Sequence, residues 1–275
     1  MFYTDFSEDY NEIFPFSRDV YSLLEGFLFS GDTPEARLYT EACPATGPSI
    51  DSLKGLESHI TRKRRVLDLG CGTGKYCGKF TSGGTRTTGI DLDSGMIKKA
   101  RESFPDSDFR VMNLTEISSL VQEKQSGGPS PFDLIYSTGN VMAHIDCNSF
   151  KGFLPEMKKL LSPGGIWIFQ VMNWEFILKQ DFFRFPEIES RTKVFSRTYT
   201  DISEEKLSFN TELKNKSDGE SVFKESVTLY PVQCEEYIRM HEEEGFKLMG
   251  HYGNYEKGPF KPEIFSAAIY VFQKD

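Results

Sequence analysis

From Arg65 onward the chain alternates short apolar runs, rich in Val, Leu, Ile and Phe, with longer stretches of helical periodicity. The apolar runs are Val66–Leu69, Thr87–Ile90, Phe109–Met112, Phe132–Tyr136 and Ile166–Val171. Such alternation is typical of βαβ units, which build a mainly parallel sheet with helices on both faces. Right-handed crossovers place the loops that follow the strands at one edge of that sheet, where ligands bind. The sequence therefore predicts an α/β fold with a ligand site at this edge.

Three glycines, Gly70, Gly72 and Gly74, directly follow the first apolar run. A strand that enters glycines and then a helix lets a ligand approach the backbone closely at the helix N-terminus. A dinucleotide fingerprint needs its third glycine where Lys75 stands, and a phosphate-binding P-loop needs Ser or Thr where Tyr76 stands. The turn is therefore expected to hold neither a dinucleotide nor ATP.

The segment Leu67–Gly74 resembles the first motif of class I S-adenosylmethionine-dependent methyltransferases. The segment Gly89–Met96 strengthens this resemblance, because its Asp91 stands where the family places an acidic residue on the ribose hydroxyls. A carboxylate accepts two hydrogen bonds from a vicinal diol, which gives strong and orientation-specific anchoring. The alternative is that Asp91 only caps the helix that starts near Ser94. The resemblance implies S-adenosylmethionine as cofactor.

The same resemblance implies a Rossmann-like, seven-stranded, mainly parallel sheet with an antiparallel last strand, a helical N-terminal cap and an antiparallel β insertion. The cap fits the helical spacing of apolar residues near the start of the chain, and the insertion fits a period of two between about 186 and 231. We expect a single methyltransferase domain, 1–275, made of a helical cap (1–60), a cofactor-binding core (61–175), a substrate-side insertion (176–232) and a final helix with strands (233–275).

The expected cofactor-binding residues follow the glycine turn and the ends of the first four strands. They are Asp68, Gly70, Cys71, Gly72, Gly74, Asp91, Leu92, Met96, Asn113, Leu114, Ser137, Thr138 and His144, together with Tyr10 as a lid from the N-terminal segment. Asn113 would lie beside the adenine, since an amide both donates and accepts, or it would be a plain turn or cap residue. His144 would lie near the methionine part of the cofactor or be an ordinary histidine at a helix start. Asp68 would touch the ligand or orient the glycine turn through its amides.

Two loops resemble the glycine N-methyltransferase branch of this family: the loop of Asn140 and His144, and the segment Met172–Glu175. The resemblance implies that Asn140, Asn173 and Trp174 bind the methyl acceptor. Met172 stands where that branch has the arginine that holds the carboxylate of glycine, so glycine is expected to be a poor acceptor.

Other arrangements remain open for these positions. Another cation, Arg184, Arg191 or Arg197, would be needed to hold a carboxylate in place of that arginine. Alternatively, Met172 and Trp174 pack into the core and the acceptor site lies elsewhere under the insertion.

The composition limits the kinds of molecule that the protein is expected to bind. The formal net charge of -9 disfavours nucleic acid as a binding partner. The basic run Arg62–Arg65 is interpreted as a solvent-exposed segment that leads into the first strand. The five cysteines form no C-x-x-C pair, and His59, His241 and His251 show no metal-ligand spacing, so neither disulfides nor a metal is predicted. A secretion signal and a long apolar run are both missing from the sequence, which favours a soluble, cytoplasmic protein without a membrane partner.

The predicted function is methyl transfer from S-adenosylmethionine to a small molecule. No residue stands out as a catalytic base, which favours N-methylation of an amine over O-methylation, because an amine only has to arrive neutral. The alternatives are a methyltransferase that acts on RNA or protein, and a non-catalytic module that binds S-adenosylmethionine. The sequence names neither the acceptor nor the oligomeric state.

Overall fold

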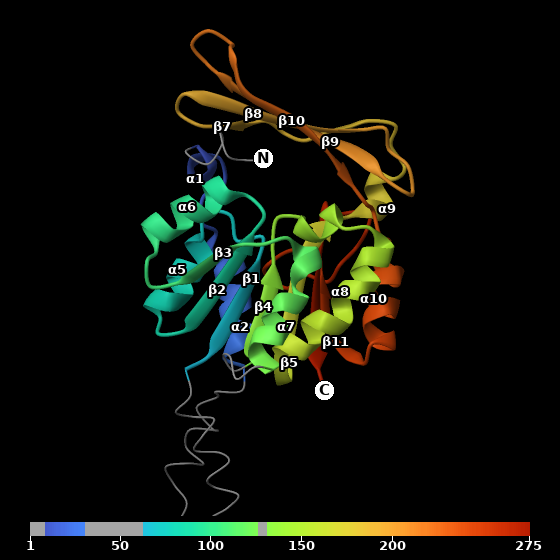
Figure 1. The fold of residues 1–275 in the computed structure, drawn as a ribbon. Helices are drawn as coiled ribbons and strands as arrows, with labels where there is room; N and C mark the ends of the chain where they lie inside the picture. Colours follow the sequence, from blue (N-terminus) through green and yellow to red (C-terminus); the bar gives the residue numbers. More distant parts are fainter. Residues whose placement is uncertain (1–8, 31–62, 126–130) are drawn as a thin grey trace, which may run out of the picture.

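A computed structural model describes residues 9–30, 63–125 and 131–275 (Figure 1). Its centre is a seven-stranded sheet with the strand order β11-β12-β5-β4-β1-β2-β3. The strands are β1 (Arg65–Leu69), β2 (Arg86–Asp91), β3 (Asp108–Val111), β4 (Phe132–Ser137), β5 (Leu161–Met172), β11 (Phe246–Tyr252) and β12 (Ala267–Lys274). β12 pairs antiparallel with both β5 and β11, and the other pairs are parallel. The predicted fold class, including the antiparallel last strand, is confirmed.

Helices cover both faces of this sheet. The helices and 3₁₀ turns are α1 (Tyr10–Ile13), α2 (Arg18–Leu28), α5 (Lys75–Ser82), α6 (Ser94–Ser103), η2 (Leu114–Glu116), α7 (Ser118–Gln125), η3 (Val141–His144), α8 (Cys147–Leu160), α9 (Trp174–Ile177) and α10 (Cys234–Glu243). α2 and α5 pack with Val66, Leu134 and Ile168 on one face. α7, α8 and α10 belong to the larger core on the other face, which contains Leu67 and Trp167. Successive residues of β1 thus point to opposite, equally buried faces, as expected of a central parallel strand.

A second, smaller sheet forms the predicted insertion. Its strands are β6 (Phe183–Arg184), β7 (Ile188–Glu189), β8 (Lys193–Thr200), β9 (Leu207–Asn215) and β10 (Ser221–Leu229). β10, β9, β8 and β6 pair in that order, and β7 also pairs with β8. β9 and β10 form the antiparallel hairpin that the period of two predicts. We call these five strands the insertion sheet.

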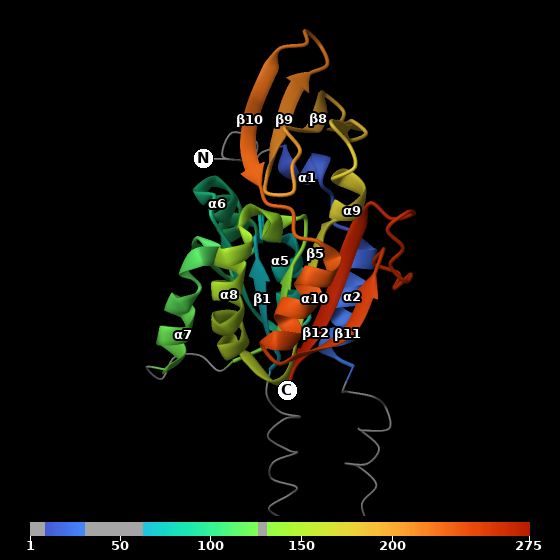
Figure 2. The same cartoon turned by 90° about the vertical axis from the view of Figure 1, so that its right-hand side faces the viewer.

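The insertion sheet lies over the end of the central sheet at which the parallel strands finish (Figures 1 and 2). Two hydrogen bonds join β8 and the residue directly after β10 to the loop after β4. The Tyr230 amide donates to the Ala143 carbonyl at 2.8 Å, and the Asn140 side-chain amide donates to the Tyr199 hydroxyl at 3.4 Å. The insertion sheet therefore covers the edge where the ligand loops are expected.

One strand starts earlier than expected, and part of the predicted cap lies outside the described residues. β5 starts at Leu161, whereas the turn residues before 166 predicted a later start, and its pairing with β4 changes register between Phe132 and Leu134. Of the predicted helical cap 1–60, only residues 9–30 lie within the described part of the chain, where they form α1 and α2. The division of 1–275 into functional parts stays a prediction.

Candidate cofactor and acceptor site

The glycine turn, residues 70–74, lies between β1 and α5 and is fixed to β2. The amides of Gly70 and Cys71 both donate to the Ile90 carbonyl, at 2.8 and 2.9 Å. Gly70, Gly72 and Gly74 have φ angles of 80°, 52° and 76°, in the left-handed region that favours glycine. The nearest described atoms to a Cβ on Gly72 would belong to the Tyr10 ring, the closest 3.3 Å away, so this aromatic side chain lies against the backbone of the turn.

Asp91, at the end of β2, binds the glycine turn directly. Its Oδ2 accepts from the Gly72 amide at 2.8 Å, and its Oδ1 accepts from the Asp93 amide at 2.9 Å. Burial raises the pKa of Asp91, while these two amides oppose that shift. The hydrogen bonds from Gly72 and Asp93 use one lone-pair position on each Asp91 oxygen, and the Leu92 amide also interacts with this carboxylate, so each oxygen retains some acceptor capacity for a ligand.

The alternative role of Asp91 as a helix cap is wrong. Asp93 caps α6 instead, because its Oδ1 accepts from the amides of Gly95 at 2.8 Å and Met96 at 3.0 Å. The Asp91 carboxylate is thus available to the turn and to a ligand, whereas Asp93 stabilises the helix that follows.

Asp68 lies beneath the turn and does not orient it through its amides, so that expectation is wrong. Its Oδ2 accepts from the Tyr136 hydroxyl at 2.8 Å and faces the Cys77 thiol at 3.7 Å. Burial raises the pKa of Asp68 to about 7, although the hydrogen bond from Tyr136 acts in the opposite direction. The residue is 2% exposed and so has almost no surface for a ligand. Its side chain links β1 to β4 and α5 below the turn.

The short helix α1 covers the glycine turn. The Thr73 hydroxyl donates to the Asn11 side-chain oxygen at 2.6 Å, and the Lys75 ammonium donates to the Phe14 carbonyl. The same ammonium lies 5.5 Å from the centre of the Tyr10 ring. Tyr10 is therefore held in contact with the turn, as a lid residue would be.

On its other side α1 contacts the insertion sheet. The Asp9 carboxylate pairs with the Lys193 ammonium at 3.1 Å, and Glu12 accepts from the Arg191 amide at 3.0 Å. Ile13 packs with Phe195 of β8 in a small separate core. α1 thus connects the glycine turn to the insertion sheet.

Two exposed apolar side chains flank Asp91 at the edge of the sheet. Leu92 is 62% exposed, and Val111, paired with Asp91 across β2 and β3, is 48% exposed. Such exposed apolar surface beside a polar anchor suits a flat ring. Leu92 was expected here. Val111 was not among the expected residues, although an apolar residue at the last position of a strand that ends at this edge is a usable signal.

The other predicted residues near this edge have different surroundings. Met96 is buried at 1% exposure, and Leu114 is half-buried. The Asn113 side-chain oxygen accepts from the Thr115 amide at 3.1 Å, so this oxygen caps η2, as the alternative for Asn113 expected. Its amide nitrogen remains the group suited to a base edge.

The loop after β4 is held by side chains from neighbouring strands. The buried Ser137 hydroxyl donates to the Leu69 carbonyl at 2.8 Å, which leaves only the Ser137 backbone for a ligand. Thr138 is half-buried and His144 is exposed. The Gly139 amide donates to the Gln170 side chain at 2.9 Å, a positioning contact that the sequence did not indicate.

The three predicted acceptor residues do not form one group. Asn140 has a φ of 67°, its side-chain oxygen accepts from the Met172 amide at 2.9 Å, and its nitrogen donates to Tyr199. Asn173 is fully buried, and its side chain donates to the carbonyls of Pro262 at 2.6 Å and Phe265 at 2.8 Å. The expected acceptor role of Asn173 is therefore wrong, because its amide holds the loop before β12.

Trp174 also departs from the expected role. It is 1% exposed and belongs to the main core, with its ring centre 5.9 Å from that of Tyr199. Met172 packs against the same core. The arrangement agrees with the alternative in which Met172 and Trp174 are core residues and the acceptor lies under the insertion.

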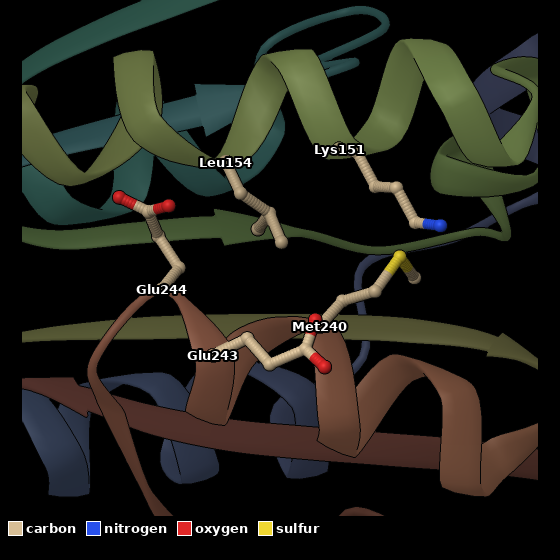
Figure 3. Close-up of a pocket in the computed structure, with 5 residues that line it drawn as sticks. All are labelled: Lys151, Leu154, Met240, Glu243 and Glu244. Carbon is tan, nitrogen blue, oxygen red and sulfur yellow. The ribbon is translucent and has the colours of Figure 1, made fainter.

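A separate pocket of about 240 Å³ lies between α8 and α10 (Figure 3). Lys151 and Leu154 of α8 line it together with Met240, Glu243 and Glu244 from α10 and the turn after it. None of these five residues belongs to the loops at the carboxyl edge of the sheet. The pocket is therefore distinct from the site around the glycine turn.

Within 9–30, 63–125 and 131–275, His, Cys, Asp and Glu side chains make no group of three that would hold a metal ion. Among the helices in these ranges, none has the length and apolar character needed to cross a membrane.

Comparison with known sequences identifies the segment that builds this site. Residues 66–165 match the methyltransferase domain family. A putative methyltransferase of Invertebrate iridescent virus 6 is 43% identical over 58 residues, which cover 20% of this chain and 22% of the relative. Glycine N-methyltransferase of Rattus norvegicus is 28% identical over 125 residues, which cover 42% of each chain. The chain thus spans less than half the length of these curated relatives.

Among solved structures, an S-adenosylmethionine-dependent methyltransferase from Clostridium acetobutylicum has the same fold. Its TM-score is 0.64 at 14% identity, with 90% of this chain and 97% of that chain covered. Curated relatives at 28% identity also include a ubiquinone biosynthesis O-methyltransferase of Maricaulis maris, over 40% of this chain and 41% of the relative. Residues 66–165 thus resemble the methyltransferase domain family, and the chain shares its fold with an S-adenosylmethionine-dependent methyltransferase.

Proposed function

We propose that the whole protein transfers a methyl group from S-adenosylmethionine to the nitrogen of a small-molecule amine. The observation that carries this proposal is the arrangement of Asp91 at the glycine turn. Its carboxylate holds the Gly72 amide and keeps acceptor capacity for the two hydroxyls of a ribose. Leu92 and Val111 offer apolar surface on either side of Asp91 for an adenine. These residues fit the nucleoside part of the cofactor.

The surroundings favour a small acceptor. The insertion sheet and α1 cover the carboxyl edge, which suits a compact molecule better than a long polymer. The formal net charge of -9 opposes binding to a phosphate backbone. We propose on the same grounds that nucleic acid is not a partner, and a cytoplasmic location stays a prediction.

Nitrogen is the proposed target because the chain then needs no strong base. When bound, S-adenosylmethionine supplies a methyl group already activated by its positively charged sulfur. The protein has to exclude water and align the acceptor. Tyr199 is the titratable side chain that contacts Asn140, and burial raises its pKa, so it is a poor base at neutral pH. A neutral amine brings its own lone pair, whereas a hydroxyl acceptor would need such a base.

S-adenosylhomocysteine should raise the melting temperature of the protein, because a ligand that binds only the folded state stabilises it. At a hundredfold excess over Kd the gain is about 2.7 kcal/mol, which corresponds to several degrees. Differential scanning calorimetry measures this shift, with NAD and ATP as control ligands that should leave it unchanged. The absence of both a shift and calorimetric binding would contradict the proposed function.

Glycine should be a poor acceptor, although rat glycine N-methyltransferase is among the relatives. Met172 stands at the end of β5 without a charge to pair with the carboxylate, and desolvating an unpaired anion is costly. We expect methyl transfer to glycine to be slower than transfer to ethanolamine, measured with labelled S-adenosylmethionine. Efficient turnover of glycine would refute the argument from Met172.

A further inference from the structure

The strand register of the insertion sheet places three polar residues side by side between two apolar rows. Tyr199 pairs with Phe209 and Phe195 with Leu213, and each row continues onto β10. The apolar rows are Phe195, Leu213 and Phe223, and Tyr199, Phe209 and Val227. Between them, Arg197 of β8 pairs with Thr211 of β9, which pairs with Glu225 of β10. We call Arg197, Thr211 and Glu225 the polar row.

The polar row is on the face of the insertion sheet that looks toward the methyltransferase domain. Phe195 packs with Ile13 of α1, and Tyr199 belongs to the main core. Because side chains two residues apart on a strand share a face, Arg197 lies on this inner face between those two contacts. The opposite face is polar throughout this region: Glu212 pairs there with Lys214 at 3.0 Å and lies 3.9 Å from Lys224, which is 74% exposed.

The polar row differs from the rows on either side of it, which are apolar on the same inner face of the insertion sheet. Thr211 is 2% exposed, and its hydroxyl donates to the Glu225 carbonyl at 3.4 Å. Burying polar and charged groups costs free energy that an apolar row at the same positions would avoid, and such exceptions concentrate at functional sites. A row of this kind therefore points to recognition of a polar molecule.

Arg197 is held in an orientation suited to an anion. Its guanidinium lies 4.8 Å from the Phe185 ring centre, and one nitrogen donates to the Pro186 carbonyl at 3.1 Å. Stacking on an aromatic ring fixes the plane of a guanidinium, whose five N–H donors match a carboxylate or a phosphate.

The polar row lies between the two groups that border the proposed reaction space. On one side the Arg197 guanidinium is 5.9 Å from the ring of Phe14, which directly follows α1 and lies beside Tyr10, whose ring lies against Gly72. On the other side Tyr199, two residues along β8, binds Asn140 of the loop after β4. A molecule that contacts the polar row would thus lie over the carboxyl edge, next to the glycine turn.

We propose that the polar row recognises the methyl acceptor, with Arg197 binding an anionic group of that acceptor and Thr211 and Glu225 binding its hydrogen-bond donors. This inference rests on the proposed function. Because Arg197 belongs to the insertion sheet and not to the end of β5, the anionic group of the acceptor would lie away from the edge of the central sheet. The acceptor is therefore an amine whose carboxylate or phosphate is separated from the nitrogen by more than the single carbon of glycine.

Matched acceptor pairs test this assignment. Methyl transfer to 4-aminobutyrate is compared with transfer to its neutral amide, and 2-aminoethyl phosphate with ethanolamine, so that the two pairs distinguish a carboxylate from a phosphate. The wild-type protein should prefer the anionic member of at least one pair. Arg197→Gln should lower kcat/KM for that member about 10- to 100-fold and lower it much less for the neutral member, as expected for hydrogen bonds to a charged group.

Arg184→Gln is the matched control. Arg184 is an exposed residue of β6 in the same sheet, so its substitution removes the same charge outside the polar row and should have little effect. Equal rates for anionic and neutral acceptors in the wild type, or equal effects of the two substitutions, would overturn the assignment.

Binding measurements separate this inference from the proposed function. With S-adenosylhomocysteine present, the preferred anionic probe should raise the melting temperature of the wild type and not that of Arg197→Gln. The shift caused by S-adenosylhomocysteine alone should persist in Arg197→Gln, which also shows that this variant folds. If Arg197→Gln does not fold, Arg197→Lys replaces it in the experiment. This variant keeps the positive charge but lacks the planar guanidinium, so kcat/KM for the anionic acceptor should fall by a smaller factor. A wild type that binds S-adenosylhomocysteine but none of the anionic probes would overturn only the role of the polar row.

Discussion

Asp91→Ala should weaken the binding of S-adenosylhomocysteine by on the order of 100-fold, or about 3 kcal/mol. The substitution removes the acceptor proposed for the ribose hydroxyls, and it also releases the Gly72 amide from its 2.8 Å hydrogen bond. Both losses act at the same place, because the turn and the ribose share one carboxylate. Isothermal titration calorimetry on the folded variant measures the change.

Asp93→Ala is the matched control for this experiment. Asp93 is two residues away and also carries a carboxylate, but it caps α6 through the amides of Gly95 and Met96. Its loss should lower the free energy of unfolding by about 1 kcal/mol and leave the affinity nearly unchanged. Unchanged affinity in a folded Asp91→Ala protein would mean that the ribose binds elsewhere.

Gly74→Ala should destabilise the protein by about 2–5 kcal/mol. Gly74 has a φ of 76°, where a side chain costs about 1–2 kcal/mol. Its new Cβ atom would also lie 2.5 Å from Phe109 Cζ and 2.9 Å from Ala100 Cβ, and overpacking of this kind costs about 1–3 kcal/mol. Urea denaturation followed by circular dichroism measures the free energy of unfolding.

Gly84→Ala separates the two contributions. Gly84 has a φ of 88°, but a Cβ atom there would have no atom within 4 Å. Only the backbone strain of about 1–2 kcal/mol is expected. If both variants lose the same stability, close packing around Gly74 is not what requires a glycine at that position.

The sequence predicted the sheet well because its signals are local. The apolar runs and the turns between them mark β1 to β4, and the expected final strands are present as β11 and β12. The start of β5 was missed because the turn-like residues at 162–165 continue the strand, with Gly164 at a φ of 69° and a change of register against β4. The start of β5 is determined by its pairing with β4, which the local sequence does not show.

The site was harder to predict, because distant partners decide what a side chain does. Asn173 looks suited to an acceptor, but its amide is used by Pro262 and Phe265, 89 and 92 residues away. Asp68 is committed to Tyr136, 68 residues along the chain. Arg197 was only one of three candidate cations until the strand register placed it on the inner face. Backbone features such as the glycine turn depend less on such partners, and they were placed correctly.

The short helix α1 contacts the cofactor side through Asn11 and Thr73 and the insertion sheet through Asp9 and Lys193. A ligand at the glycine turn that orders α1 would also order the contacts of α1 with the insertion sheet, so a second ligand bound there would lose less conformational entropy. Thermodynamic linkage requires this effect to be reciprocal, so that each ligand would raise the affinity for the other by the same factor. We therefore expect the cofactor and the proposed acceptor to bind cooperatively, coupled through a single turn of helix.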